Sequence, residues 1–142
     1  MIQQLAIFSE NKPGRLERIT DALTQANVNI RAIHVASLGD MGVIKLVVDR
    51  PDDAYKALGA PAAVRKIPCV AVRVRDRPGA LHEVTRVLSQ AGINIENASG
   101  FAVSRSEAIL ILEVADVLAA ERILAQAEFS TLDEGEFEAA VA

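Results

Sequence analysis

Cysteine and histidine are scarce in this sequence, and long apolar runs are missing. The single cysteine, Cys69, excludes a disulfide framework and a cluster of thiolate metal ligands. No stretch approaches the ~18 apolar residues of a transmembrane helix. The N-terminal residues, MIQQLAIFSE, lack the basic segment and apolar core of a secretory signal. We therefore expect a cytoplasmic protein that does not contact a membrane.

The familiar signatures of catalysis are also missing. The sequence contains no P-loop, no HExxH motif and no GxSxG motif. His34 and His82 are isolated and are expected to be packing or surface residues, and Cys69 is expected to be a small buried apolar residue. A net charge of −4 argues against binding to nucleic acid, which depends largely on neutralising phosphates. We expect no enzymatic activity, no cofactor and no metal.

What the sequence does contain is a long internal repeat. Residues 11–30 read NKPGRLERITDALTQANVNI, and residues 76–95 read DRPGALHEVTRVLSQAGINI. Between 12–30 and 77–95, nine of nineteen positions are identical. The offset of 65 residues then carries Ile44 onto Ile109 without a gap, and Ala54 onto Ala119. Two copies indicate a duplicated domain, because a solenoid needs more.

Each copy combines the period of a strand with the period of a helix. Val70, Val72 and Val74 alternate with other residues, as in a strand with one buried face. A helical spacing of apolar residues follows the Pro-Gly turn in both copies. Its members are Leu16, Ile19, Leu23 and Ala26 in the first copy, and Leu81, Val84, Leu88 and Ala91 in the second.

The rest of each copy predicts a hairpin, a second helix and a last strand. In the first copy, GDMG joins strands 29–38 and 43–49, a helix begins near Pro51 and ends at Gly59, and the last strand covers 63–67. The second copy has strands 94–103 and 107–114, a helix 116–126 and a strand 128–132. The order βαββαβ predicts an α+β fold of two ferredoxin-like units, each with an antiparallel sheet.

The repeat also predicts how the chain is organised. We expect one domain over residues 1–68 and another over 69–142, joined through Pro68 without a flexible linker and packed as a tandem pair. A unit of ~65 residues is marginally stable by itself. Because each unit presents sheet edges, we also expect a homodimer.

The Pro-Gly turn before the first helix of each copy has two interpretations. A helix N-terminus offers unpaired N–H groups that suit a carboxylate, and a glycine lets a ligand approach the backbone. Asp76 or Asn11 could then accept hydrogen bonds from an ammonium group, which describes a free amino acid, with Asn29 and Asn94 as further amide partners. In the alternative, Asp76 and Asn11 only cap the helices.

The recurring [ND]-[KR]-P-G-x-L motif and the QA-x-[VI]-N-I helix end resemble the ACT-domain family over essentially the whole chain. The resemblance implies a small-molecule sensor, most often of amino acids, which acts within or beside a metabolic enzyme. It also implies two candidate pockets near the first turn of each unit. They comprise Asn11, Lys12, Pro13, Gly14, Arg15, Leu16 and Asn29 in the first unit, and Asp76, Arg77, Pro78, Gly79, Ala80, Leu81, Asn94 and Ile95 in the second.

The two copies differ at the turn, which suggests that one pocket is degenerate. Asn11 is neutral where Asp76 is charged, and the bulky Arg15 replaces Ala80. Gly100 is expected to leave space that Val35 fills in the first copy. Elsewhere, the cluster Arg65, Lys66, Arg73, Arg75 and Arg77 predicts either a solvated sheet surface or attraction of a carboxylate. The tail DEGEFEAAVA is expected to fray unless Phe137 docks on a partner.

Two functions therefore remain open. The first is a non-catalytic regulatory protein that binds an amino acid and changes the arrangement of its domains or subunits. The second is a structural or protein-interaction module that needs no ligand, such as a regulatory subunit of a biosynthetic enzyme or a transcription-control protein. An intact pocket, or a gain of stability with ligand, favours the first.

Overall fold

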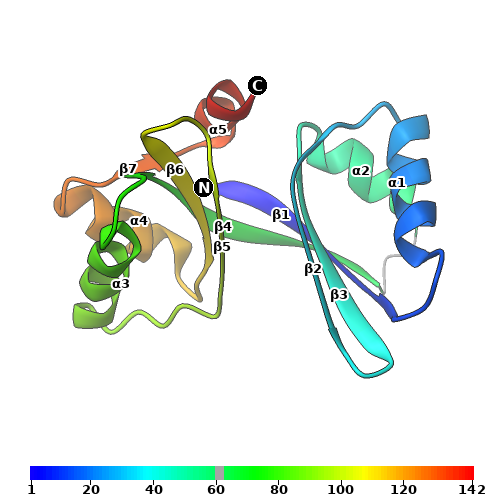
Figure 1. Cartoon of the computed structure of the whole chain (residues 1–142), viewed down its shortest axis with the longest axis horizontal. Coiled ribbons are helices and arrows are strands. Elements are labelled where there is room, and N and C mark those ends of the chain that lie inside the picture. The colour runs from blue at the N-terminus through cyan, green and yellow to red at the C-terminus, as the bar shows by residue number, and fades with distance from the viewer. Residues whose placement is uncertain (60–62) are drawn as a thin grey trace. The chain divides into compact units, whose positions relative to one another are not determined.

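The computed structural model describes residues 1–59 and 63–142, and it divides into two compact units (Figure 1). The first unit is Gln3–Ile67, and the second unit is Pro68–Ala142 together with Met1–Ile2. The two N-terminal residues belong to the second unit, where the Met1 ammonium forms an ion pair of 2.7 Å with the Glu121 carboxylate.

Both units have the expected order of strands and helices. The first unit is built from β1 (Ile2–Glu10), α1 (Arg15–Gln25), β2 (Ile30–Leu38), β3 (Met41–Val48), α2 (Pro51–Leu58) and the beginning of β4 (Val64–Arg75). The second unit is built from the rest of β4, α3 (Ala80–Gln90), β5 (Asn97–Ala102), β6 (Glu107–Glu113), α4 (Val117–Gln126), β7 (Ser130–Leu132) and α5 (Glu134–Val141).

The strand pairs are antiparallel in both units, as predicted. In the first unit β3 lies between β1 and β2 and pairs with both. In the second unit β4 pairs with β6 on one side and with β7 on the other, and β5 pairs with β6. The ferredoxin-like class predicted from the repeat is confirmed.

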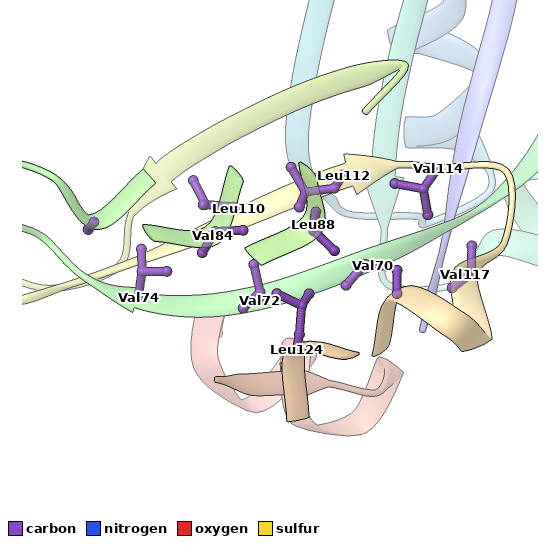
Figure 2. Close-up of a cluster of buried hydrophobic side chains, with 12 residues drawn as sticks. Val70, Val72, Val74, Val84, Leu88, Leu110, Leu112, Val114, Val117 and Leu124 are labelled. Atoms are coloured by element: carbon purple, nitrogen blue, oxygen red, sulfur yellow. The ribbon is translucent and has the colours of Figure 1, made fainter. Parts of the chain in front are cut away.

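Helices α3 and α4 pack on one face of the sheet of the second unit (Figure 2). Val70 and Val72 of β4 are fully buried against Val84 and Leu88 of α3, as their spacing predicts. The prediction for Leu81 is wrong, because its side chain is 50% exposed. Ala80, which is buried, begins the core-facing stripe of α3, and Leu81 lies about 100° farther around the helix.

The first unit has a core of its own. Leu23 of α1 and Ala54 of α2 are buried against Leu5, Ile44 and Leu46 of the sheet. The two clusters of buried side chains share no member. Each unit therefore buries its own apolar surface between one sheet and a pair of helices.

The gapless offset of 65 residues is wrong beyond the hairpin of each unit. Ile44 and Leu110 pair with equivalent residues of β1 and β4, so the counterpart of Ile44 lies 66 residues on, and is not Ile109. The buried alanine that matches Ala54 is likewise Ala120, 66 residues on. The turn between Val103 and its partner Glu107 holds three residues, 104–106, whereas the turn between the equivalent Leu38 and Met41 holds two, 39–40, and this one-residue insertion shifts everything after it.

Two other segments differ from their predictions. The strands expected on either side of Pro68 form one continuous strand, β4, of 12 residues. The acidic tail does not fray: it forms α5, which begins with a capping box between Asp133 and Glu136. Phe137 of α5 is only 3% exposed and meets the ring of Phe101 edge-on, with 6.2 Å between the centroids.

Candidate functional site

The Pro-Gly turn has the same backbone shape in both units. Gly14 and Gly79 are the N-cap residues of α1 and α3, and their φ angles of 89° and 87° lie in the left-handed region. Glycine is required there because a side chain strains this conformation. Neither helix has a side-chain cap. The interpretation of Asn11 and Asp76 as helix caps is therefore wrong.

The turn of the second unit has unused polar groups. The backbone N–H of Asp76 donates to the Ser106 carbonyl at 2.9 Å, whereas the Asp76 carboxylate has no partner among residues 1–59 and 63–142. In the first turn of α3, the amides of Leu81 and His82 have no acceptor among these residues either. A Cβ added to Gly79 would meet no described atom within 4 Å, so the backbone at Gly79 is accessible.

The turn of the first unit is occupied by its own side chains. The Asn11 side-chain amide donates to the Gly39 carbonyl at 3.1 Å. Arg15 is only 8% exposed, and its Nη2 donates to the Ser37 hydroxyl at 3.1 Å. The Arg15 guanidinium also lies against Gly42, where any side chain would clash with it. Ala80 stands at the position of Arg15 in the second unit, so the two turns are not equivalent.

The asparagines predicted for the two pockets lie far from the turns of their own units. Asn29 and Asn94 follow the C-terminal ends of α1 and α3, and each helix has 11 residues, or about 16 Å of length. The Asn29 N–H donates to the Asp49 carboxylate at 2.9 Å, and Asn94 is exposed in a loop. One unit by itself does not bring its turn and its asparagine together.

A cavity of about 290 Å³ lies beside the turn of the second unit. Arg77 and Ala80 are the predicted site residues that line it. The sequence analysis did not group the other residues that line this cavity into one site, although it singled out the alternating arginines of β4. These residues are Arg73, Val74, Arg75, Glu83, Glu107, Glu128, Phe129 and Ser130.

A hollow of about 260 Å³ occupies the equivalent place in the first unit. Its charged lining residues are Arg15 and Arg18, and it is otherwise lined by Ser9 and apolar side chains. The fold therefore makes a hollow at this place twice, and the sequence gives carboxylates only to the second one.

The space predicted beside Gly100 is not open. A Cβ at this position would lie 2.8 Å from Cδ2 of Leu110 in the paired strand β6. The Leu110 side chain therefore fills the volume that the missing side chain leaves, and the prediction of a vacant space there is wrong.

The remaining candidates are structural. Arg65 lies over the ring of Phe8 at 5.8 Å, and Lys66 pairs with Asp52 at 2.5 Å, a contact that lowers the pKa of the Asp52 carboxyl below its usual value. Cys69 is buried, as expected, and His34 is exposed. In the described part of the chain, no group of three or more His, Cys, Asp or Glu side chains could hold a metal ion. None of the helices described is both long and apolar enough to cross a membrane.

Comparison with known proteins assigns the family. The sequence model of the family described as "ACT domain pair" matches residues 1–139 of this chain. The chain belongs to the ACT-domain-pair family. No protein with a curated description matches the chain.

Solved structures resemble this ACT domain pair over nearly their whole length. Protein BT0572 of Bacteroides thetaiotaomicron is 32% identical, with 95% of this chain and 94% of that chain covered and a TM-score of 0.88. The regulatory subunit of aspartate kinase from Thermus thermophilus is 19% identical, with 88% and 91% covered and a TM-score of 0.65. At that identity the second likeness shows the fold alone.

Proposed function

We propose that this ACT domain pair is a non-catalytic regulatory protein that binds a free amino acid at the Asp76–Leu81 turn. The observation that carries the proposal is the difference between the two turns. Among the described residues, the second turn has an unpartnered carboxylate and an accessible glycine, whereas the first is filled by Arg15 and tied to the hairpin by Asn11.

The polar groups of the turn suit the head of an amino acid. The amides of Leu81 and His82 would bind the carboxylate at the positive end of α3. The Asp76 carboxylate would accept hydrogen bonds from the ammonium group. Asn94 and Ile95 follow the other end of α3, so the proposed site at this turn does not include them.

The first site is the weaker one in this proposal. Of its members, Asn11 and Arg15 already donate to other groups of the unit, and Lys12 pairs with Glu10 at 3.2 Å. Pro13, Gly14 and Leu16 repeat the motif, and Asn29 repeats the asparagine, without an unpartnered carboxylate to hold an ammonium.

The proposed mechanism is a shift of population. An amino acid that binds one arrangement of domains or of a homodimer better than another favours that arrangement, and a metabolic enzyme senses the change. The likeness in fold to a regulatory subunit of aspartate kinase supports an enzyme as the partner. The cytoplasm, where free amino acids and biosynthetic enzymes meet, is the proposed location.

A thermal-shift screen with the twenty amino acids tests the proposal. A ligand at about 100 times its Kd stabilises the folded protein by about 2.7 kcal/mol. We expect one amino acid, or a few related ones, to raise the Tm. If no amino acid does so at millimolar concentration, the protein is a ligand-free interaction module and the sensor proposal fails.

A pair of matched variants locates the site. Asp76→Ala should remove a charge-assisted hydrogen bond worth about 1.5–3 kcal/mol, or about ten- to a hundred-fold in affinity. Asn11→Ala, at the equivalent position of the first unit, should change the affinity little. Calorimetric titration of both variants measures this difference, and equal losses would contradict the assignment to the second turn.

A further inference from the structure

Each unit has a sheet face that its pair of helices does not cover. In the second unit, helix α5 covers part of this face, where the buried Phe137 meets the Phe101 ring edge-on. The first unit ends inside β4, at Ile67, and its chain continues without a break into the second unit. Because the first unit ends within its last strand, none of its residues is left to fold back as α5 does.

The strand register identifies the equivalent place in the first unit. In the second unit, the row of paired residues that contains the α5 contact consists of Phe101 of β5, Ile109 of β6 and Arg73 of β4. In the first unit, the equivalent row consists of Ala36 of β2, Val43 of β3 and Phe8 of β1. Each row has one aromatic side chain, which lies on an edge strand in the second unit and on an inner strand in the first. The counterpart of the place that α5 covers is therefore centred on Val43.

The row of the first unit is open at the surface. Ile109 is fully buried, whereas its counterpart Val43 is only half-buried and the neighbouring Phe8 is exposed. Leu38, the next residue of β2 on the same face, is 90% exposed. A hollow of about 330 Å³ lies here, which we call the hairpin hollow, and it is lined by Phe8, Ala36, Ser37, Leu38, Met41, Gly42 and Val43. Exposed apolar side chains that lie together in this way, instead of being scattered, mark a site of interaction.

The charges beside the hairpin hollow favour an acidic partner. The basic side chains on this sheet face are Arg65, Lys45 and His34. The Arg65 guanidinium lies over the Phe8 ring, 5.8 Å from its centroid, and has no ion pair among residues 1–59 and 63–142. Of the nearby carboxylates, Glu10 already pairs with Lys12 at 3.2 Å, and Asp40 lies in the hairpin turn. An acidic group that approaches the hollow therefore meets a cation at its rim.

We propose that the hairpin hollow docks an acidic amphipathic helix of a partner protein, which places one aromatic side chain beside Phe8. Helix α5 shows this combination within the chain itself. It buries a single ring, Phe137, and its acidic residues, counted from the N-cap, are Asp133, Glu134, Glu136 and Glu138. The sheet face that α5 covers carries Arg73 and Arg75, since Arg73 pairs with Ile109 and the two arginines flank Val74 of the core. An acidic helix on a basic sheet face is thus the arrangement that the second unit already uses.

The helix for the first unit comes from another polypeptide, because α5 of the same chain already buries Phe137 in the second unit. Its aromatic side chain fills the hairpin hollow, as a large apolar anchor does when a helix binds in a groove. The Arg65 guanidinium donates hydrogen bonds to one of its carboxylates. Every residue of this docking site belongs to the first unit, so the site does not depend on the amino acid proposed at the Asp76–Leu81 turn.

Amide NMR of the full-length, ¹⁵N-labelled protein tests the docking with a probe made from α5. The probe is a peptide of residues 133–142, DEGEFEAAVA, held helical by a staple between positions 135 and 139. Both positions are exposed in α5 and lie on the side of the helix away from Phe137. We expect the peptide to shift the amides of Phe8, Leu38, Gly42 and Val43, with a Kd below about 1 mM. No shift at this concentration, or shifts confined to residues around Phe101, would overturn the proposal.

Two altered peptides separate the contribution of the ring from that of the charges. Phe137→Ala in the peptide removes the anchor and should weaken binding at least about tenfold. Glu134→Gln with Glu138→Gln keeps the capping box of the helix and should weaken binding about two- to fivefold at low salt. This second difference should disappear near 1 M salt, which screens exposed charges. If the Phe137→Ala peptide binds as tightly as the original, the hollow does not hold an aromatic anchor and the proposal is wrong.

Variants of the protein complete the test. Leu38→Ser and Arg65→Gln should each weaken binding of the peptide about fivefold or more, and both side chains are exposed, so the fold should tolerate the changes. The matched controls are Leu118→Ser on α4 and Lys56→Gln on α2, which packs on the other face of its sheet, and both should leave the affinity unchanged. Light scattering checks for a second copy of the chain as the occupant. If Leu38→Ser converts a dimer into a monomer and the peptide fails to do so, the hollow joins two copies and the proposal is wrong.

Discussion

Two glycines of the second unit show what single residues do in this fold. Gly79 is needed for its backbone conformation, with a φ of 87°, although space for a side chain is available beside it. Gly100 is needed for space, because Leu110 occupies the volume of its missing side chain. The sequence offers both as glycines and does not distinguish them. The Pro-Gly motif predicted only that a ligand could approach the backbone at Gly79; the φ angle of Gly79 and the packing of Leu110 beside Gly100 come from the structure.

Substitution of Gly79 tests the backbone requirement. Gly79→Ala should lower the free energy of unfolding by about 1–2 kcal/mol, since a Cβ disfavours the left-handed conformation. Gly79→Asn should cost less, because asparagine adopts this conformation more readily. Urea denaturation of the unmodified protein and of the two variants measures the order of their free energies of unfolding. Equal losses for Ala and Asn would mean that the cost lies in contacts and not in the φ angle.

The candidate site also shows where sequence reasoning stops at the level of residues. Arg15 stands in the first turn where the second turn has Ala80, and this difference correctly indicated that the two turns are not equivalent. It could not show that Arg15 folds back onto Ser37 and Gly42, since these residues are distant in sequence.

At the scale of elements, α5 is the segment that sequence reasoning misjudged. Its acidic, alanine-rich composition suggested fraying, but Asp133 and Glu136 have the spacing of a capping box. The helix is held by Phe137, which packs on Phe101. Phe101 lies on the face of the sheet opposite α3 and α4, because its neighbour Gly100 pairs with the core residue Leu110. Helix α5 therefore covers part of the second face of its sheet.

Removal of the Phe137 ring tests this role of α5. Phe137→Ala should destabilise the second unit by about 3–5 kcal/mol, the usual cost of deleting a buried aromatic side chain. Leu118→Ala is the control, because Leu118 is 65% exposed on α4 and should change stability by no more than about 0.5 kcal/mol. Thermal and urea denaturation compare the two variants. A similarly small effect of both would show that α5 is only loosely attached.

At the scale of the whole molecule, the repeat predicted the fold well because duplication makes each copy a check on the other. Where the sequence pattern of a strand or helix was ambiguous in one copy, the equivalent segment of the other copy gave a second prediction of the same element. The repeat failed at the hairpins, where one extra residue moves the counterpart of Ile44 from Ile109 to Leu110. Apolar residues stand at both positions, so hydrophobicity could not reveal the shift, and only the strand register does.

The presence of two separate cores leads to a prediction for the whole chain. Leu23 and Leu88 are equivalent, each at most 1% exposed, and each belongs to the core of its own unit. Leu23→Ala and Leu88→Ala should each cost about 2–5 kcal/mol, since each leaves a cavity in a closely packed core. Because the two clusters of buried side chains share no member, the loss of stability should increase amide hydrogen exchange mainly in the unit that carries the substitution.

The two units are not fully independent, because strand β4 belongs to both. It belongs to the first unit up to Ile67 and to the second from Pro68, without a break in the strand. We therefore expect Leu23→Ala to accelerate exchange throughout Gln3–Ile67, to reach the amides of β4 just beyond Pro68, and to leave α3 and α4 protected. Hydrogen-exchange mass spectrometry resolves these segments. Uniform acceleration over both units would instead show that the two cores unfold as one cooperative body.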